Sequence, residues 1–451
     1  MTNTKQATAL GTEPIRKLLI RYALPAIIAM TASSLYNMVD SIFIGQGVGP
    51  MAITGLALTF PLMNLAAAFG SLVGVGASTL ISVKLGQKDY VTAQRVLGNV
   101  LVLNVLLGLA FTLVVYPFLT PILNFFGASE ATLGYAYDYM EIILFGNIVT
   151  HMYFGLNAVL RSSGNPKQAM YATISTVLIN TILDPVFIYG FGWGIRGAAI
   201  ATVTAQFCSL LWQLLFFSNQ ERLLHFHRGI FKLQRRIVMD SLAIGLSPFL
   251  MNTAACFIVI LINQGLQRHG GDLAIGAYGI VNRLVFIVVM IVMGFNQGMQ
   301  PIAGYNYGAR LFTRVDRVLK LTIFCATCVT TFGFLVGELF PEAVVSIFTT
   351  DSDLVARSVK GLRITVIFFP IIGFQMVTSN FFQSIGMAGK SIILSLSRQL
   401  LILLPCLLIL PHFYGENGVW YSMPVSDLLA SLIALFMLLQ QLNKFKREKS
   451  E

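Results

Sequence analysis

The feature that most constrains this chain is a series of twelve apolar stretches, each of roughly 20 residues or more, that recur along its 451 residues. Each stretch is long enough to cross a hydrocarbon core of about 30 Å as a helix. Because lipid leaves no backbone polar group unsatisfied, and the short alternating pattern of a barrel is missing, each stretch is predicted to be a helix. We place them near residues 18–45, 52–83, 96–118, 132–158, 168–190, 197–218, 237–265, 273–303, 319–340, 358–382, 391–413 and 418–441.

The composition excludes a soluble globular protein. Hydrophobic residues make up 56% of the chain and charged residues 11%, and the mean hydropathy is +0.76. An ordinary soluble domain carries about 25% charged residues. The predicted fold class is therefore an all-α polytopic membrane protein, with the lipid bilayer as its surroundings.

Lys and Arg residues indicate how the predicted helices are oriented. The N-terminal segment, every second connection and the C-terminal tail carry 23 of the 30 basic residues, whereas the opposite connections carry five. Since positive residues collect on the cytoplasmic side, both termini are predicted to be cytoplasmic, in a multi-pass protein of the cell membrane. The formal charge of +11 is spread over seven cytoplasmic segments rather than one patch, so we expect no nucleic-acid partner.

An internal repeat divides the chain into two halves of six predicted spans each. Two cytoplasmic glycine motifs and several other positions match at an offset of 222 residues: Gly86 with Gly308, Arg95 with Arg317, Phe126 with Phe348 and Gly164 with Gly386. An even number of spans per half makes the repeat parallel, with a pseudo-two-fold axis along the membrane normal and a substrate path expected between the halves. The predicted domains are a six-helix bundle at 14–218, a basic cytoplasmic linker at 219–236 and a second six-helix bundle at 237–445.

Two carboxylates lie deep in apolar stretches of the first half. Asp40 and Asp184 have no basic neighbour in sequence, and a carboxylate at bilayer depth costs at least about 2.5 kcal/mol, so such residues usually mark an ion or proton pathway. Asn180 lies four residues before Asp184, and Ala198 and Thr202 have the same spacing on the next helix, so each pair shares a helix face. Carboxylate, amide, hydroxyl and carbonyl oxygens are hard ligands that suit Na⁺ or a hydrated proton.

Simpler interpretations of the two acids remain open at this stage. A simpler explanation of Asp40 is a packing role, with hydrogen bonds to Tyr36 and Asn37 on its own helix, and a simpler explanation of Asp184 is a helix that ends before Pro185. Pro25 and Pro185 each remove a backbone hydrogen bond. We expect both helices to bend near their acids.

Three motifs give the chain a family resemblance. VDSIFIG in the first span, LRSSGNPK after the fourth and NTILDPVFIYG in the fifth resemble the MATE (multidrug and toxic compound extrusion) family, and the likeness extends over all twelve spans and both halves. The resemblance implies a cation site in the N-terminal half, formed by an acid of the first helix with groups of helices four to six. Carried onto this chain, the implied site is Asp40, Asn180, Asp184, the Ala198 carbonyl and Thr202, and it implies that Na⁺ can bind there.

The resemblance also implies a supporting network and a branch of the family. Tyr139 and Asn157 of the fourth helix would be hydrogen-bonding neighbours of the site, together with Tyr36 and Asn37. In another branch, acids on the seventh and tenth helices carry coupling. Here the seventh predicted span has only Asp240 at its cytoplasmic edge and the tenth has no acid, so the chain departs from that pattern.

A substrate cavity is expected to combine adaptable apolar side chains with polar groups of the second half. Methionine and aromatic residues tolerate varied ligands. Away from the ends of its predicted spans, the second half contributes only Arg283 and Arg398 as basic residues, whereas a phosphate-bearing substrate would need several. The candidate lining residues are Met30, Met38, Met63, Phe154, Asn282, Arg283 and Gln297.

The predicted function is cation-coupled export of cationic or amphipathic compounds by alternating access. The chain has no Walker sequence, so we expect an ion gradient of H⁺, Na⁺ or both to supply the energy, with no cofactor, and a monomeric protein. The alternative is a flippase for lipid-linked sugars, or an exporter of an endogenous metabolite, on the same fold. An intramembrane enzyme is disfavoured because no HExxH, GxGD or serine–lysine pair occurs at a common depth.

Overall fold

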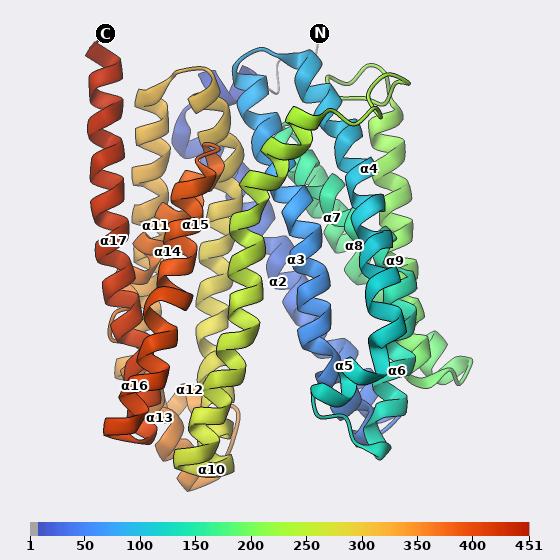
Figure 1. The fold of residues 1–451 in the computed structure, drawn as a ribbon, viewed down its shortest axis with the longest axis vertical. Helices are drawn as coiled ribbons and strands as arrows, with labels where there is room; N and C mark the ends of the chain where they lie inside the picture. The colour runs from blue at the N-terminus through green and yellow to red at the C-terminus, as the bar shows by residue number, and fades with distance from the viewer. Residues whose placement is uncertain (1–7, 451) are drawn as a thin grey trace. The chain divides into compact units, whose positions relative to one another are not determined.

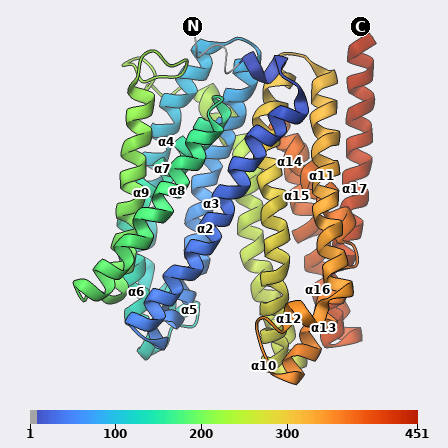
Figure 2. The same cartoon turned by 180° about the vertical axis from the view of Figure 1, so that it is seen from behind.

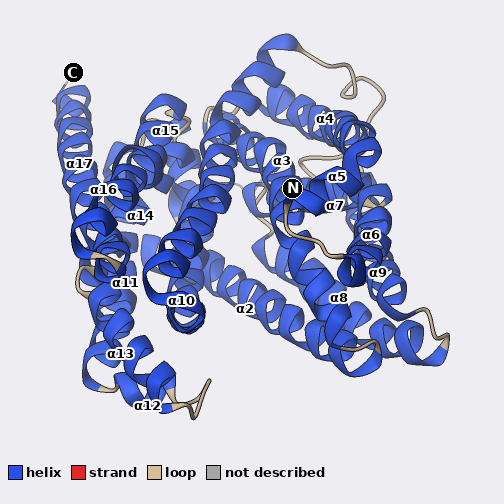
Figure 3. Cartoon of the chain, turned by 60° about the horizontal axis from the view of Figure 1, so that its bottom comes forward, coloured by secondary structure: helices blue, strands red, loops and turns tan. Residues whose placement is uncertain are grey.

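The structure, a computed structural model, describes residues 8–450, apart from the side chains of Met38, Pro50, Asp272 and 446–450. The described part is built of helices and contains no strand (Figure 3). An all-helical chain of this hydropathy satisfies its backbone hydrogen bonds within each segment, as a lipid environment requires. The predicted fold class is therefore confirmed.

Most helices follow one another through short connections, and a longer loop at residues 219–234 joins α9 to α10 (Figure 1). The first half contains α2 (Ile15–Gly47), α3 (Pro50–Gly86), α4 (Tyr90–Val115), η1 (Tyr116–Phe118), α5 (Leu119–Phe125), α6 (Glu130–Phe145), α7 (Asn147–Ser162), α8 (Pro166–Pro185), η2 (Val186–Gly190) and α9 (Gly194–Ser218). The second half contains α10 (Arg235–Gly308), α11 (Phe312–Leu339), α12 (Pro341–Val345), α13 (Ser352–Val366), α14 (Phe369–Ser384), α15 (Ala388–Leu396), η3 (Ser397–Leu403), α16 (Leu404–Tyr414) and α17 (Glu416–Ser450).

Within the described residues, ten helices are long and apolar enough to span a membrane. Two further spans are broken: α6 and α7 meet at 56°, and α13 and α14 meet at 55°. Counting each bent pair as one span gives the twelve predicted from the sequence. The element α10 comprises two of these spans, because its backbone leaves the helical conformation at Gly271 (φ 69°).

The chain folds into two compact units whose borders lie inside helices. Among the described residues, unit 1 contains residues 8–12 and 28–249, and unit 2 contains residues 13–27 and 250–450. The first part of α2 therefore belongs to unit 2, and the first part of α10 belongs to unit 1. Each border follows a proline by one or two residues: Pro25 in α2 and Pro248 in α10.

In unit 1, glycines allow the first part of α10 to lie directly against α3. A Cβ added to Gly245 would overlap the carbonyl of Leu72, and one added to Gly76 would overlap the carbonyl of Ser241. Small residues at such crossings let two helix backbones approach closely in a membrane. This contact fixes the beginning of α10 to unit 1.

Unit 2 contains a matching contact between the first part of α2 and the second half of α10. A Cβ on Gly298 would overlap the backbone of Ala23, and one on Gly294 would overlap Ile27. Gly298 lies 222 residues after Gly76, at the offset of the sequence repeat. The two units therefore use the same kind of small-residue crossing.

The core that positions the candidate site lies in unit 1. It joins Ile44 of α2 to Tyr139 of α6, Ile188 of η2 and Ala198 of α9. Figure 2 shows the later part of α2 beside α8, and the Tyr189 hydroxyl donates to the Phe43 carbonyl at 3.1 Å. Unit 2 has a separate core around Trp420.

Candidate functional site

The two acids selected from the sequence come together in unit 1. Asp40 of α2 is 6% exposed and Asp184 of α8 is fully buried, and the two side chains lie within hydrogen-bonding distance. Two carboxyl groups can share a hydrogen bond only if one of them carries a proton. The ion pairs formed among the described residues leave out both of these acids.

Three further predicted residues adjoin the acids. The Asn180 amide donates to Asp184 Oδ1 at 3.2 Å, and the Thr202 hydroxyl donates to the Ala198 carbonyl at 3.1 Å. In the described structure, one oxygen each of Asp40, Asn180 and Asp184 is buried without a hydrogen-bond donor. Three such oxygens on two helices form a site with an excess of acceptors, which favours a bound proton or small cation.

Two tyrosines connect α9 to the helices that carry the acids. The hydroxyl of Tyr36 lies 3.2 Å from Thr202 Oγ1, and Tyr139 of α6, which is 2% exposed, also lies beside Thr202. Tyr36 lies one helical turn from Asp40 on α2. Thr202 is therefore the point where α2, α6 and α9 meet beside the acids.

Two members of the predicted network lie elsewhere. The Asn37 side chain is exposed. Asn157 is buried, but its amide donates to the Ala169 carbonyl at 2.9 Å and to Thr173 Oγ1 at 3.3 Å, and its oxygen accepts from Arg161. Asn157 therefore contacts α8 several helical turns before Asp184.

The two prolines have different local effects. Directly after Pro185 the backbone changes from α-helical to π-helical hydrogen bonding, in η2. Single π-turns inside helices are often found at functional sites. The helix α2 continues through Pro25 to Gly47.

The candidate cavity residues fall into both units. Met30, Met63 and Phe154 belong to unit 1, and Phe154 is exposed. Asn282, Arg283 and Gln297 belong to unit 2, and the first two of these are exposed as well. The side chain of Met38 lies outside the described residues.

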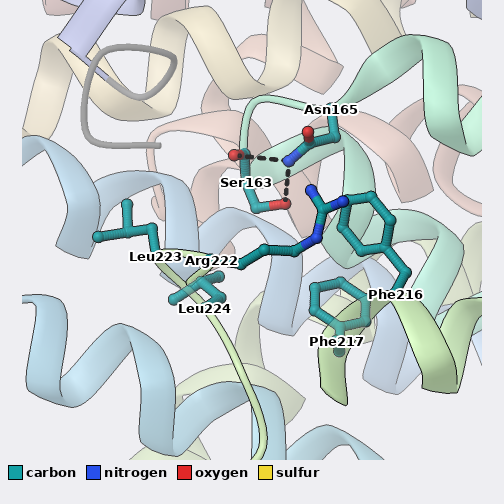
Figure 4. A pocket seen from close by; sticks show the side chains of 7 residues that line it. All are labelled: Ser163, Asn165, Phe216, Phe217, Arg222, Leu223 and Leu224. Atoms are coloured by element: carbon teal, nitrogen blue, oxygen red, sulfur yellow. Dashed lines mark hydrogen bonds between the residues drawn. The ribbon is translucent and has the colours of Figure 1, made fainter. Parts of the chain in front are cut away.

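A pocket is visible at the opposite end of α8. It is lined by Ser163, Asn165, Phe216, Phe217, Arg222, Leu223 and Leu224 (Figure 4). The Arg222 guanidinium lies 3.5 Å from the centre of the Phe216 ring. Since Asn165 precedes α8 and Asp184 lies near its end, this pocket is separate from the acid pair.

Sequence reasoning did not select several polar residues that lie along α7, α8 and α9. Thr173 and Thr176 of α8 form hydrogen bonds to Asn157 and Ser209 on the neighbouring helices. Their spacing from Asn180, at seven and four residues, places them on the same helix face. That periodic spacing was a signal in the sequence.

Comparison with known proteins identifies the family. The family model MatE matches residues 25–186 and 244–408. Multidrug export protein MepA of Staphylococcus haemolyticus (strain JCSC1435) is 28% identical over 436 residues, covering 97% of this chain and 96% of that protein. The solved structure of the MATE multidrug transporter DinF-BH is 36% identical with a TM-score of 0.90, covering 96% of this chain and 98% of that one.

A second solved structure, of a multidrug resistance MATE family transporter of the MOP superfamily in an outward-facing conformation, is 25% identical with a TM-score of 0.91. The similarity covers 98% of this chain and 99% of the chain in that structure. The family model matches once in each half of the chain, as the sequence repeat predicts. This chain therefore belongs to the MatE family of membrane transporters and is not an enzyme.

Proposed function

We propose that this chain is a cation-coupled antiporter that exports cationic or amphipathic small molecules across the cell membrane by alternating access. The observation that carries the proposal is the buried pair Asp40 and Asp184, which lie within hydrogen-bonding distance and have no basic partner in the described structure. Buried acids in a membrane protein are costly and are typical of ion and proton pathways. The resemblance to a multidrug export protein supports the same class of substrate.

The donor set of this site suits either coupling ion. The unpaired oxygens of Asp40, Asn180 and Asp184, with the Ala198 carbonyl and the Thr202 hydroxyl beside them, are hard ligands for Na⁺. The carboxyl pair is equally suited to take up one proton as a coupled unit. Asp40, Asn180, Asp184, Ala198 and Thr202 are accordingly the proposed cation site, in the N-terminal half of the chain.

In this mechanism the coupling ion and the exported molecule compete for the negative charge of the acids. Binding of H⁺ or Na⁺ from outside neutralises the pair, so a cationic guest loses its countercharge and leaves. Pro25 removes a backbone hydrogen bond from α2, which makes that helix the proposed element of bending. A membrane potential of about 100 mV adds roughly 2.3 kcal/mol for each charge moved inward.

The proposed topology follows from the basic residues. Both termini lie in the cytoplasm, and the bundles at 14–218 and 237–445 are joined there by the linker at 219–236. The acids then lie in the half of the membrane that faces outward, because α2 and α8 carry them near their non-cytoplasmic ends. The protein is proposed to act as a monomer.

The test is transport by purified protein in liposomes. Asp40→Asn and Asp184→Asn should each reduce ethidium efflux driven by an imposed H⁺ or Na⁺ gradient to the rate of protein-free liposomes, because an amide neither binds the proton nor supplies the charge. Ethidium fluorescence follows the efflux, with the gradients imposed one at a time to identify the ion.

Asp138→Asn is the matched control. Asp138 is half exposed and pairs with Arg196 at 3.3 Å on the surface of the same unit, so its loss should leave efflux at the wild-type rate. Ion-driven efflux that persists in either acid variant contradicts the proposal. Wild-type transport that responds to neither gradient would favour the flippase or metabolite exporter instead.

A further inference from the structure

A proton bound at Asp184 is far from the other end of its own helix. Asp184 lies at the end of α8, which begins at Pro166, and at 1.5 Å per residue the two are about 27 Å apart. In the proposed topology the Pro166 end is cytoplasmic. A proton that binds at the acids and is released at the Pro166 end covers this distance in every cycle.

One face of α8 is polar over most of that distance. Thr173, Thr176, Asn180 and Asp184 follow one another at intervals of three or four residues, which places them on one face. Asn180 is 1% exposed, and its amide oxygen is buried without a protein donor.

The neighbouring helix α9 presents a matching polar face. It packs against α8, and Thr202, Gln206, Ser209 and Gln213 are spaced along it at three or four residues. Ser209 and Gln213 are buried, and both amide atoms of Gln213 lack a protein partner. An apolar contact would have been less costly at these positions.

The third helix of this interface, α7, carries Thr150, Tyr153, Asn157 and Arg161 with the same periodicity. It packs against both α8 and α9, and Thr150 donates to Gln206 of α9. We name the polar side chains on these three facing surfaces the polar seam. It lies entirely within unit 1.

At the centre of the polar seam, two hydroxyls share one acceptor. Thr176 Oγ1 lies 2.7 Å from Ser209 Oγ and 2.9 Å from the Ala172 carbonyl, and Ser209 Oγ lies 3.2 Å from the same carbonyl. Each hydroxyl has one proton, so either Thr176 donates to Ser209 or Ser209 donates to Thr176, while the other donates to Ala172. Both arrangements satisfy every donor.

The hydroxyl of Tyr153 extends this pair toward the Pro166 end of α8. It lies beside the hydroxyls of Thr173 and Thr176, and Thr173 accepts a hydrogen bond from the Asn157 amide at 3.3 Å. The sequence of hydroxyls is therefore Ser209, Thr176, Tyr153 and Thr173. It runs along the side of α8 that also carries the acid.

We propose that the polar seam relays protons between Asp184 and the Pro166 end of α8, an inference that rests on the proposed cation-coupled function and assigns H⁺ as a coupling ion. In each step a hydroxyl oxygen accepts a proton from the side of Asp184 and releases its own proton to the next oxygen, so no charge or atom accumulates. Rotation of the hydroxyls restores the starting arrangement. Na⁺ cannot move in this way, because it has to carry its whole coordination shell.

The two ends of the relay differ. A full helical turn of about 5.4 Å separates Thr176 from Asn180, a distance that one bridging water spans, so the step beside the acids needs a water molecule. At the other end, the Arg161 guanidinium bonded to Asn157 raises the energy of an excess proton by charge repulsion, which opposes the entry of protons from that end.

The experiment measures proton release and substrate binding separately. Thr176→Val combined with Ser209→Ala removes the central hydroxyls, and in liposomes with a trapped pH dye, proton movement coupled to ethidium export should slow at least about tenfold. Ethidium binding to the detergent-purified variant should keep the wild-type pH profile, because Asp40 and Asp184 are unchanged. Export driven by Na⁺, if the wild type shows it, should keep its rate.

Matched variants separate a relay from a packing role. Thr176→Ser retains the hydroxyl, so its rate of proton release should equal that of the wild type. Thr181→Val is the second control: the Thr181 hydroxyl donates to the Val177 carbonyl on the same helix, and its removal should leave proton release unchanged. Wild-type proton release in the double variant overturns the relay, and so does a Thr176→Ser variant as slow as Thr176→Val. Wild-type protein that shows no ion-driven export at all would instead refute the proposed function.

Discussion

At the scale of single residues, unit 2 contains its own buried charge, and this one is paired. Arg398 Nε donates to Asp427 Oδ1 at 2.7 Å, and the Asp427 side chain is 3% exposed. Asp427→Asn would leave the guanidinium without a countercharge inside a spanning segment, which costs about 3–5 kcal/mol. We expect a marked fall in the melting temperature of the purified protein, measured in detergent.

Two comparisons test that role of Asp427. Asp316→Asn, which removes an exposed partner of Lys320 on one helix, should cost less than about 1 kcal/mol. Replacing both members of the buried pair, with Arg398→Met and Asp427→Leu together, should recover most of the stability, because no lone charge remains. An Asp427→Asn protein as stable as the wild type would show that Arg398 finds another partner.

At the scale of helices, the crossing of α3 with the beginning of α10 depends on glycine. Gly245→Val would force a side chain into the Leu72 backbone, and overpacking of this kind costs about 1–3 kcal/mol. Gly279→Val, also in α10, has open space at that position and is the matched control. Thermal unfolding in detergent should separate the two variants, and equal melting temperatures would contradict the close crossing.

Hydropathy predicted the spans well but not their internal breaks. The α6 and α7 pair and the α13 and α14 pair were each predicted as one continuous span, because a hydropathy window reports apolar length and carries no information about direction. The π-helical turn after Pro185 was anticipated only as a bend. The geometry around a proline depends on which neighbouring groups replace the lost hydrogen bond.

At the scale of the whole molecule, the acid cluster could be predicted because buried charge in an apolar segment is rare enough to be a signal. Asp40 and Asp184 lie together, an arrangement that the family resemblance implied and that the apolar context of each acid alone did not. The Thr202 contacts with Tyr36 and Tyr139 follow from helix packing, and Asn37 and Asn157 point elsewhere for the same reason. The borders of the two units within α2 and α10 could not be predicted from hydropathy, because the residues on both sides of Pro25 and of Pro248 are apolar.

The exchange of helix beginnings between the units has a consequence for synthesis. Residues 13–27 leave the ribosome first but belong to the unit that otherwise starts at Leu250. At about 5–20 residues per second, that segment waits roughly 10–45 s for its partner surface. Neither unit is complete when its own half of the chain has been made.

Splitting the chain at Gly229 in the exposed linker tests this order of assembly. Fragments 1–229 and 230–451 should each be degraded when expressed alone, because each lacks a helix beginning that its unit requires, and should accumulate in the membrane when expressed together. Membrane abundance of each fragment gives the result, and a stable, abundant single fragment would contradict it. The crossing helices thus make the biogenesis of either half conditional on the other, so that a truncated translation product cannot persist as a half-transporter that leaks ions.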